Sequence, residues 1–142
     1  MEAERYLDRI KTIDAIIDNK LSEYQRWVCV ADGMGGASIG DRVQTTRNLH
    51  SSADAIGRYI DIEREIEALR FERHRILETI EQLPSTEYVL IYKLYVQSYS
   101  MKELEFFFGM SYEWVKWKKK HALMLVQDIL DSETVQTSTE SG

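Results

Sequence analysis

The feature that most constrains the fold is a long apolar seam between residues 52 and 83. Its members recur in alternating steps of three and four residues, at Tyr59, Ile62, Ile66, Leu69, Arg73, Ile76, Ile80 and Leu83. This spacing winds them into one stripe of an α-helix, as in a coiled coil, which Arg73 alone interrupts. Pro84 ends the pattern, because the residue before a proline is pushed out of the helical conformation. A helix of this span is about 48 Å long, more than a small domain can bury.

A second amphipathic helix is predicted over residues 3–30. Its apolar stripe consists of Leu7, Ile10, Ile13, Ile17, Leu21, Tyr24 and Val28. The segment 31–48 between the two helices carries four glycines but no following Gly-Lys-Ser/Thr, so we interpret it as a flexible linker and not as a nucleotide-binding loop. Two amphipathic helices joined in this way can pair antiparallel, which predicts a helical hairpin over residues 1–83.

The seam of the 52–83 helix is longer than the first helix can cover. A second copy of the chain is the simplest partner for the remainder, and Arg73 could fix the register there. The alternative is that the seam packs on the C-terminal helices of the same chain. We therefore expect a homo-oligomer formed through residues 52–83.

Composition indicates an all-α protein of one domain's length. The 142 residues are 44% hydrophobic and 30% charged, and a single proline leaves long stretches free to be helical. Cys29 is the only cysteine, so neither an intrachain disulfide nor a cysteine-based zinc site can form within one chain. The sequence has no run of about 18 apolar residues and no apolar signal segment, so we expect a cytoplasmic protein without a membrane partner.

Residues 85–97 are predicted to form a further helix, capped by Ser85 with Glu87 in its first turn. This helix is apolar on most faces and should lie at the centre of a small bundle. A helix-turn-helix follows it. Ser100 and Glu103 have the spacing of a capping box, and Gly109 is placed to end the first helix in the left-handed conformation. Ser111 then caps a second helix, 111–130, which would be the recognition helix.

Positive charge is concentrated at the start of that second helix. Lys116, Lys118, Lys119 and Lys120 stand against Glu113 alone, a net charge of +3 in a chain whose formal net charge is −6. Cations gathered on one helix of an acidic protein are typical of phosphate contacts. The alternative is that these lysines only solvate an exposed helix face.

Five short motifs between residues 83 and 130 follow a familiar order. They are Leu94-Tyr95, Glu103-Leu104, Phe108–Ser111, Trp114-Val115 and His121-Ala122-Leu123. In this order they resemble region 4 of sigma-70-type factors. With the leading helix and the Gly-Asp-Arg-Val-Gln segment at 40–44, the chain is similar to small phage and prophage regulators of the ArpU and RinA kind. The resemblance implies sequence-specific binding of double-stranded DNA, transcriptional control of phage genes, and contact with RNA polymerase.

Two residues depart from the pattern of such units. The position four before the turn glycine is usually alanine, because the two helices touch there, and here it is Glu105. The inward position three after Val115 is normally aliphatic, and here it is Lys118. We expect either that both side chains reach out to solvent or that the helices cross differently.

Docking geometry assigns the DNA-binding residues. The start of a recognition helix faces the major groove, so base edges or nearby phosphates would be contacted by Ser111, Tyr112, Glu113 and Lys116. Lys119 and Lys120 would neutralise phosphates. Trp117 could pack on the DNA backbone, on a protein partner, or in the core against residues 106–108. Trp114 and Val115 are assigned to packing.

The sequence predicts no catalytic site, metal site or cofactor, because its three histidines are far apart and its carboxylates are spread along helix faces. The predicted helices divide the chain into a hairpin at 1–83, a DNA-binding domain at 84–131 and a disordered tail at 132–142.

Two other functions stay open. One is a phage DNA-packaging subunit of the small-terminase type, which would form rings. The other is a helical protein–protein interaction adaptor, in which the lysines dock an acidic partner.

Overall fold

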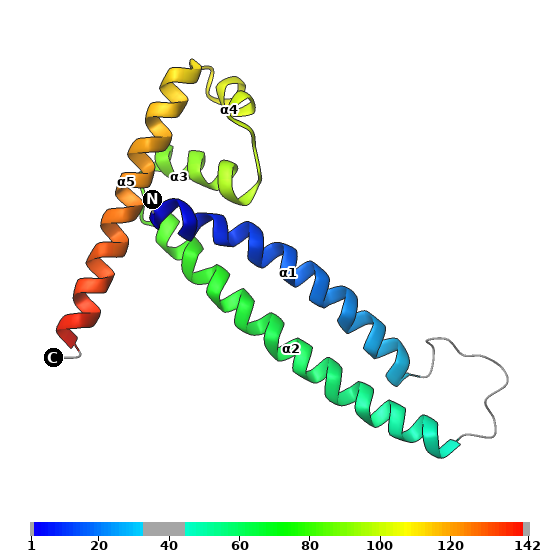
Figure 1. Cartoon of the computed structure of the whole chain (residues 1–142). Coiled ribbons are helices and arrows are strands. Elements are labelled where there is room, and N and C mark those ends of the chain that lie inside the picture. The colour runs from blue at the N-terminus through cyan, green and yellow to red at the C-terminus, as the bar shows by residue number, and fades with distance from the viewer. Residues whose placement is uncertain (1, 33–44, 141–142) are drawn as a thin grey trace. The chain divides into compact units, whose positions relative to one another are not determined.

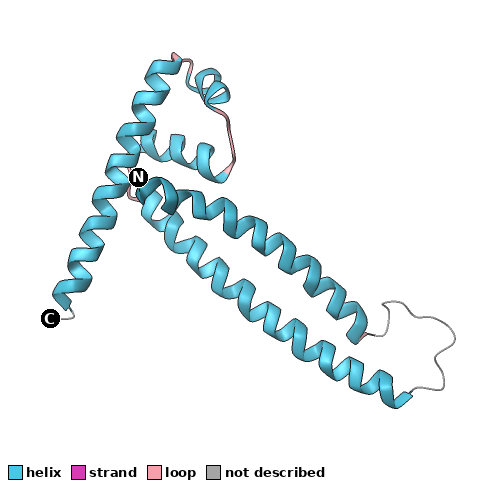
Figure 2. Cartoon of the chain, viewed as in Figure 1, coloured by secondary structure: helices cyan, strands magenta, loops and turns pink. Residues whose placement is uncertain are grey.

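The computed structural model describes residues 2–32 and 45–140, with side chains for 2–32 and 53–134, and every regular element in these residues is helical (Figure 2). Five α-helices follow one another: α1 (Glu2–Ala31), α2 (Thr45–Glu81), α3 (Ser85–Ile91), α4 (Met101–Phe108) and α5 (Tyr112–Glu140). The predicted all-α fold, a long N-terminal hairpin followed by a small helical group, is confirmed. No helix of the described residues is long and apolar enough to cross a membrane.

The helices α1 and α2 form an antiparallel hairpin (Figure 1). The Tyr6 and Thr79 hydroxyls share a hydrogen bond of 3.0 Å near its base, and Lys20 forms an ion pair with Glu65 farther along. The two predicted apolar stripes face each other, so the side chains of both stripes supply most of its buried residues: Leu7, Ile10, Ile13, Ile17, Ile66, Ile76 and Ile80. The prediction of a hairpin with an apolar seam is therefore confirmed.

The helices α2 and α5 extend beyond their predicted bounds. α2 begins at Thr45, so residues 45–48 of the predicted linker are helical, while residues 33–44 lie outside the described residues. α5 continues to Glu140, beyond the predicted end at Leu130 and into the predicted disordered tail at 132–142. No glycine or proline lies between Tyr112 and Glu140, so nothing in the sequence breaks the helix.

The chain divides into two compact units, and the division does not fall at the predicted boundary after Leu83. One unit contains residues 1–12 and 73–142, and the other contains residues 13–72. The base of the hairpin belongs with α3–α5 because α1 contacts α5 directly there. The Ala3 backbone N–H donates to the Gln127 side-chain oxygen at 3.0 Å. The base of the hairpin is thus part of the frame that holds α5.

The short helix α3 is continued by a π-helical turn at Tyr92–Val96. The predicted cap at its start is wrong: Pro84 occupies the N-cap position, and no side chain caps the first turn. Proline has no N–H to leave unpaired, so it tolerates this position. Glu87, in the first turn of this helix, is buried and does not cap it.

Candidate nucleic-acid interface

The turn between α4 and α5 has the local chemistry that the sequence predicts. Ser100 and Glu103 form the capping box, with each side chain bonded to the backbone N–H of the other residue. Gly109 adopts φ +63°, the left-handed conformation, and the Met110 N–H donates to the Glu105 carbonyl at 3.2 Å. The Ser111 hydroxyl accepts from the Trp114 N–H at 3.2 Å. Local hydrogen bonds therefore define where α4 ends and where α5 begins.

Packing between α4 and α5 fixes which face of α5 points outward. Leu104 and Val115 are fully buried, and the Trp114 ring lies 5.4 Å from that of Phe108. The assignment of Trp114 and Val115 to packing is confirmed. Glu105, at the position that is usually alanine, is half-buried.

An exposed stripe runs along the opposite face of α5. It consists of Glu113, Lys116, Trp117 and Lys120, which recur at three- and four-residue spacing and therefore share one face. Ser111 and Tyr112 are also exposed at the helix start. The structure thus brings together six of the seven predicted DNA-binding residues. We call these six residues the outward face of α5.

Lys119, the seventh predicted residue, lies on a different side of the helix. Its ammonium is 3.8 Å from the Glu4 carboxylate at the start of α1, and its side chain is largely covered. The predicted role of Lys119, neutralising a phosphate, is not supported by this position. The reason is the period of the helix, which turns adjacent residues by about 100°.

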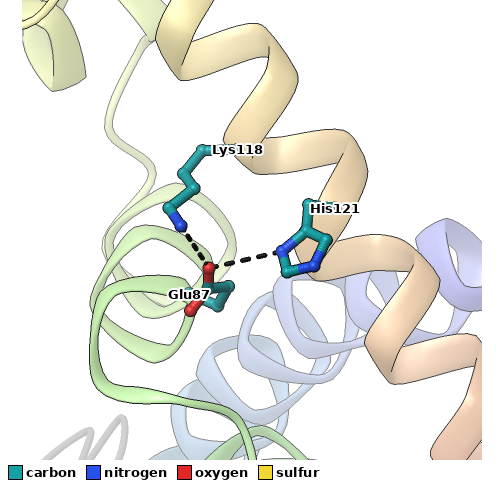
Figure 3. A network of polar contacts seen from close by, with 3 residues as sticks. All are labelled: Glu87, Lys118 and His121. Carbon is teal, nitrogen blue, oxygen red and sulfur yellow. Dashed lines mark hydrogen bonds and ion pairs between the residues drawn. The ribbon is translucent and has the colours of Figure 1, made fainter.

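Lys118 is also directed inward, where it meets a buried carboxylate (Figure 3). Its ammonium lies 2.6 Å from Glu87 Oε1, and His121 Nδ1 lies 3.3 Å from the same oxygen. Only 3% of the Glu87 surface is exposed. The first alternative, that Lys118 reaches out to solvent, is therefore wrong, because its charge is compensated inside the protein by a carboxylate from α3.

The contacts around Glu87 keep its carboxyl ionised. Burial by itself raises the pKa of Glu87, but the hydrogen bond and positive charge of Lys118, a backbone hydrogen bond and the hydrogen bond to His121 outweigh it. The net result is a pKa below the ordinary value of 4.5. Lys118 and Glu87 thus form a buried ion pair that links α3 to α5.

These pairings change the charge available to a partner. Lys118 and Lys119 are matched by Glu87 and Glu4, which leaves Lys116 and Lys120 against Glu113 on the outward face, a net of +1 in place of +3. Within the described part of the chain, no carboxylate pairs with Lys116 or Lys120. The electrostatic attraction of this face for phosphate therefore rests on two lysines.

Trp117 projects from the outward face with 58% of its surface exposed. Its ring is stacked on that of His121, with centroids 5.8 Å apart and planes 7° from parallel. His121 is in turn bonded to Glu87, so the contacts of His121 with Glu87 and with Trp117 restrict the orientation of the tryptophan ring. Of the alternatives left open for Trp117, this position favours contact with a partner over core packing.

The ionised Glu87 predicts a dependence of stability on pH. Its pKa is lower in the folded than in the unfolded chain, so its contribution is present above about pH 4.5 and is lost as the pH falls through the lower, folded value. Urea unfolding should show that Glu87→Gln is less stable than the wild type at about pH 6, and that the difference shrinks towards about pH 3. A difference that stays constant over this range would contradict an ionised Glu87.

The buried partnership of Glu87 was not predicted from the sequence. Its place in the sequence indicates only an acidic residue in the first turn of a helix. Its partners, Lys118 and His121, lie 31 and 34 positions away. One feature of the sequence could have predicted the pair. Lys118 is a charged residue at a position that normally faces inward, and a buried lysine implies a buried acid beside it.

No metal site is evident among the residues that the structure describes, since no three histidine, cysteine or acidic side chains gather in a way that could hold an ion. Comparison of the chain with protein-family models, with curated proteins and with solved structures gives no match.

Proposed function

We propose that this chain is a sequence-specific DNA-binding transcriptional regulator of the sigma-factor-like phage or prophage type, with α5 as its recognition helix. The observation that carries the proposal is the outward face of α5, on which Lys116, Trp117 and Lys120 are exposed next to the capped helix start. A helix-turn-helix presents the start of its second helix to the major groove. The capped start also directs backbone N–H groups and the positive end of the helix dipole outward, which favours phosphate.

Each exposed residue has a role in this docking mode. Lys116 and Lys120 contact phosphates and provide affinity. Tyr112 and Glu113 reach base edges, where a glutamate accepts a hydrogen bond from the cytosine amino group. Trp117 packs against the sugar–phosphate backbone. Lys119, which is paired with Glu4, takes no part in binding.

An experiment with matched lysine variants tests this proposal. A footprint on the DNA flanking the gene of this protein would provide the target duplex. The double variant Lys116→Ala/Lys120→Ala should bind that duplex about 30-fold more weakly at near-physiological salt, the loss expected for two phosphate contacts. Lys119→Ala, which changes an adjacent lysine, should bind within about twofold of the wild type. Equal affinity of the double variant and the wild type would overturn the proposal.

A helical protein–protein interaction adaptor is the second candidate, because α4 presents exposed aromatic residues. Phe106 has 91% of its surface exposed, and Phe107 and Met110 are about half exposed beside it. Large exposed apolar side chains that lie together are typical of protein interfaces. In a regulator the same surface could contact RNA polymerase. In an adaptor, Phe106→Ala would abolish partner binding while the chain shows no salt-dependent affinity for DNA.

A further inference from the structure

Apolar side chains lie exposed on the outer face of α2, away from α1. Ile56, Ile60 and Phe71 have 41%, 38% and 65% of their surfaces exposed. Their spacing of four and eleven residues places them on one side of the helix, opposite the seam residues that pack on α1. Within the described residues of the 13–72 unit, nothing covers this face.

The 13–72 unit has few buried residues of its own. Its buried apolar side chains, among those described, are Ile13, Ile17, Ala55 and Ile66. A pair of helices with so small a core is marginally stable, because each helix gains most of its stability from packing. Among its described residues, the unit therefore has little apolar burial of its own.

Gly57 lies next to these exposed residues, and no contact within the described part of the chain requires a glycine at this position. A Cβ atom at this position would meet nothing within 4 Å, and the residue is in the interior of α2. A glycine there destabilises the helix relative to alanine. Flanked by Ile56 and Ile60, it leaves a shallow recess in an apolar surface, which suits close approach by another side chain.

We propose that a second copy of this chain packs antiparallel on the outer face of α2, about a twofold axis at Arg64. Phe71 and Gly57 are each seven residues from Arg64. A twofold axis there seats Phe71 of each copy over Gly57 of the other, between Ile56 and Ile60. The same contact forms twice, which buries all the exposed apolar residues of this face. This places the expected oligomer contact on the outer face of the helix and not on its seam, which α1 covers.

The proposed register also sets which charges meet, and at the axis Arg64 of one copy lies opposite Arg64 of the other. Arg64 and Glu67 lie between the apolar residues, and both are exposed. About the proposed axis, Glu67 of each copy lies within one turn of Arg64 of the other. Glu67 pairs with Arg70 at 3.1 Å in the single chain, but both side chains are more than half exposed, so this pair is weak and can be exchanged. The two Glu67 carboxylates thus offset the two Arg64 side chains that meet at the axis.

Sedimentation of the full chain tests the interface. The wild type should be a dimer, and both Phe71→Glu and Gly57→Leu should raise its Kd roughly 30-fold or more, the loss expected for a central contact. Leucine favours helix more than glycine does, so failure to fold cannot explain the second result. Phe106→Glu, a matched change of an exposed phenylalanine on α4, should leave the dimer intact. A monomeric or ring-forming wild type, or a Phe71→Glu variant that dimerises normally, would overturn the proposal.

Cross-linking distinguishes the antiparallel arrangement from a parallel one. Cys29 is the only cysteine, so Cys29→Ser gives a background without thiols. In that background, a short bis-maleimide should link two copies through Arg64→Cys at the axis. It should not link them through Ala53→Cys, because the two positions would be about 33 Å apart. Efficient linking at both positions would indicate a parallel dimer and contradict the proposed register.

Discussion

Replacing Lys118 with alanine is expected to lower the free energy of unfolding by about 3 kcal/mol, because it leaves a buried carboxylate without its main partner. Glu87 is almost completely buried and lies 2.6 Å from the Lys118 ammonium. His121 stays within hydrogen-bonding distance of Glu87, so the loss should be at the lower end of the range for such pairs. Urea unfolding, followed by tryptophan fluorescence, measures this change.

Two further variants distinguish the loss of the buried ion pair from the loss of a lysine charge elsewhere on the helix. Lys119→Ala removes the adjacent lysine, whose ion pair with Glu4 is at 3.8 Å and partly exposed, so it should cost less than about 1 kcal/mol. The double variant Glu87→Leu/Lys118→Met replaces both charges with apolar side chains and should recover most of the stability that Lys118→Ala loses. If Lys118→Ala and Lys119→Ala are equally stable, Glu87 does not depend on Lys118 as we describe.

Truncation of Leu104 to alanine should destabilise the helix-turn-helix by about 2–5 kcal/mol, through lost burial and the cavity left behind. Leu104 is the buried residue of α4. Phe106, two residues farther along the same helix, is almost fully exposed, so Phe106→Ala should change the unfolding free energy by less than about 0.5 kcal/mol. Thermal unfolding of both variants measures the contrast. An equal effect of the two substitutions would mean that α4 packs through another face.

The sequence predicted those parts of the fold that depend on local signals. The three- and four-residue spacing of Ile66, Ile76 and Ile80 specified which side of α2 faces α1. Ser100, Glu103 and Gly109 specified where α4 begins and ends, because capping and the left-handed turn depend on residues within a few positions of each other.

The sequence could not predict contacts made across the fold. Lys118 and Lys119 belong to one basic run with Lys116 and Lys120, yet the first two pair with carboxylates from α3 and α1. Periodicity gives the angle of each lysine around α5 but not which acid it meets. The candidate recognition helix could therefore be predicted from the sequence, whereas the net charge of its outward face is lower than predicted.

The salt dependence of DNA binding by the wild type and by Lys116→Ala/Lys120→Ala tests the central proposal most directly. Phosphate contacts release counterions, so the logarithm of the binding constant falls linearly with the logarithm of salt concentration. Loss of the two unpaired lysines of the outward face should reduce the magnitude of that slope by about 1.8, while Lys119→Ala leaves it unchanged. A wild-type affinity that stays constant as salt increases would contradict recognition of DNA by this helix.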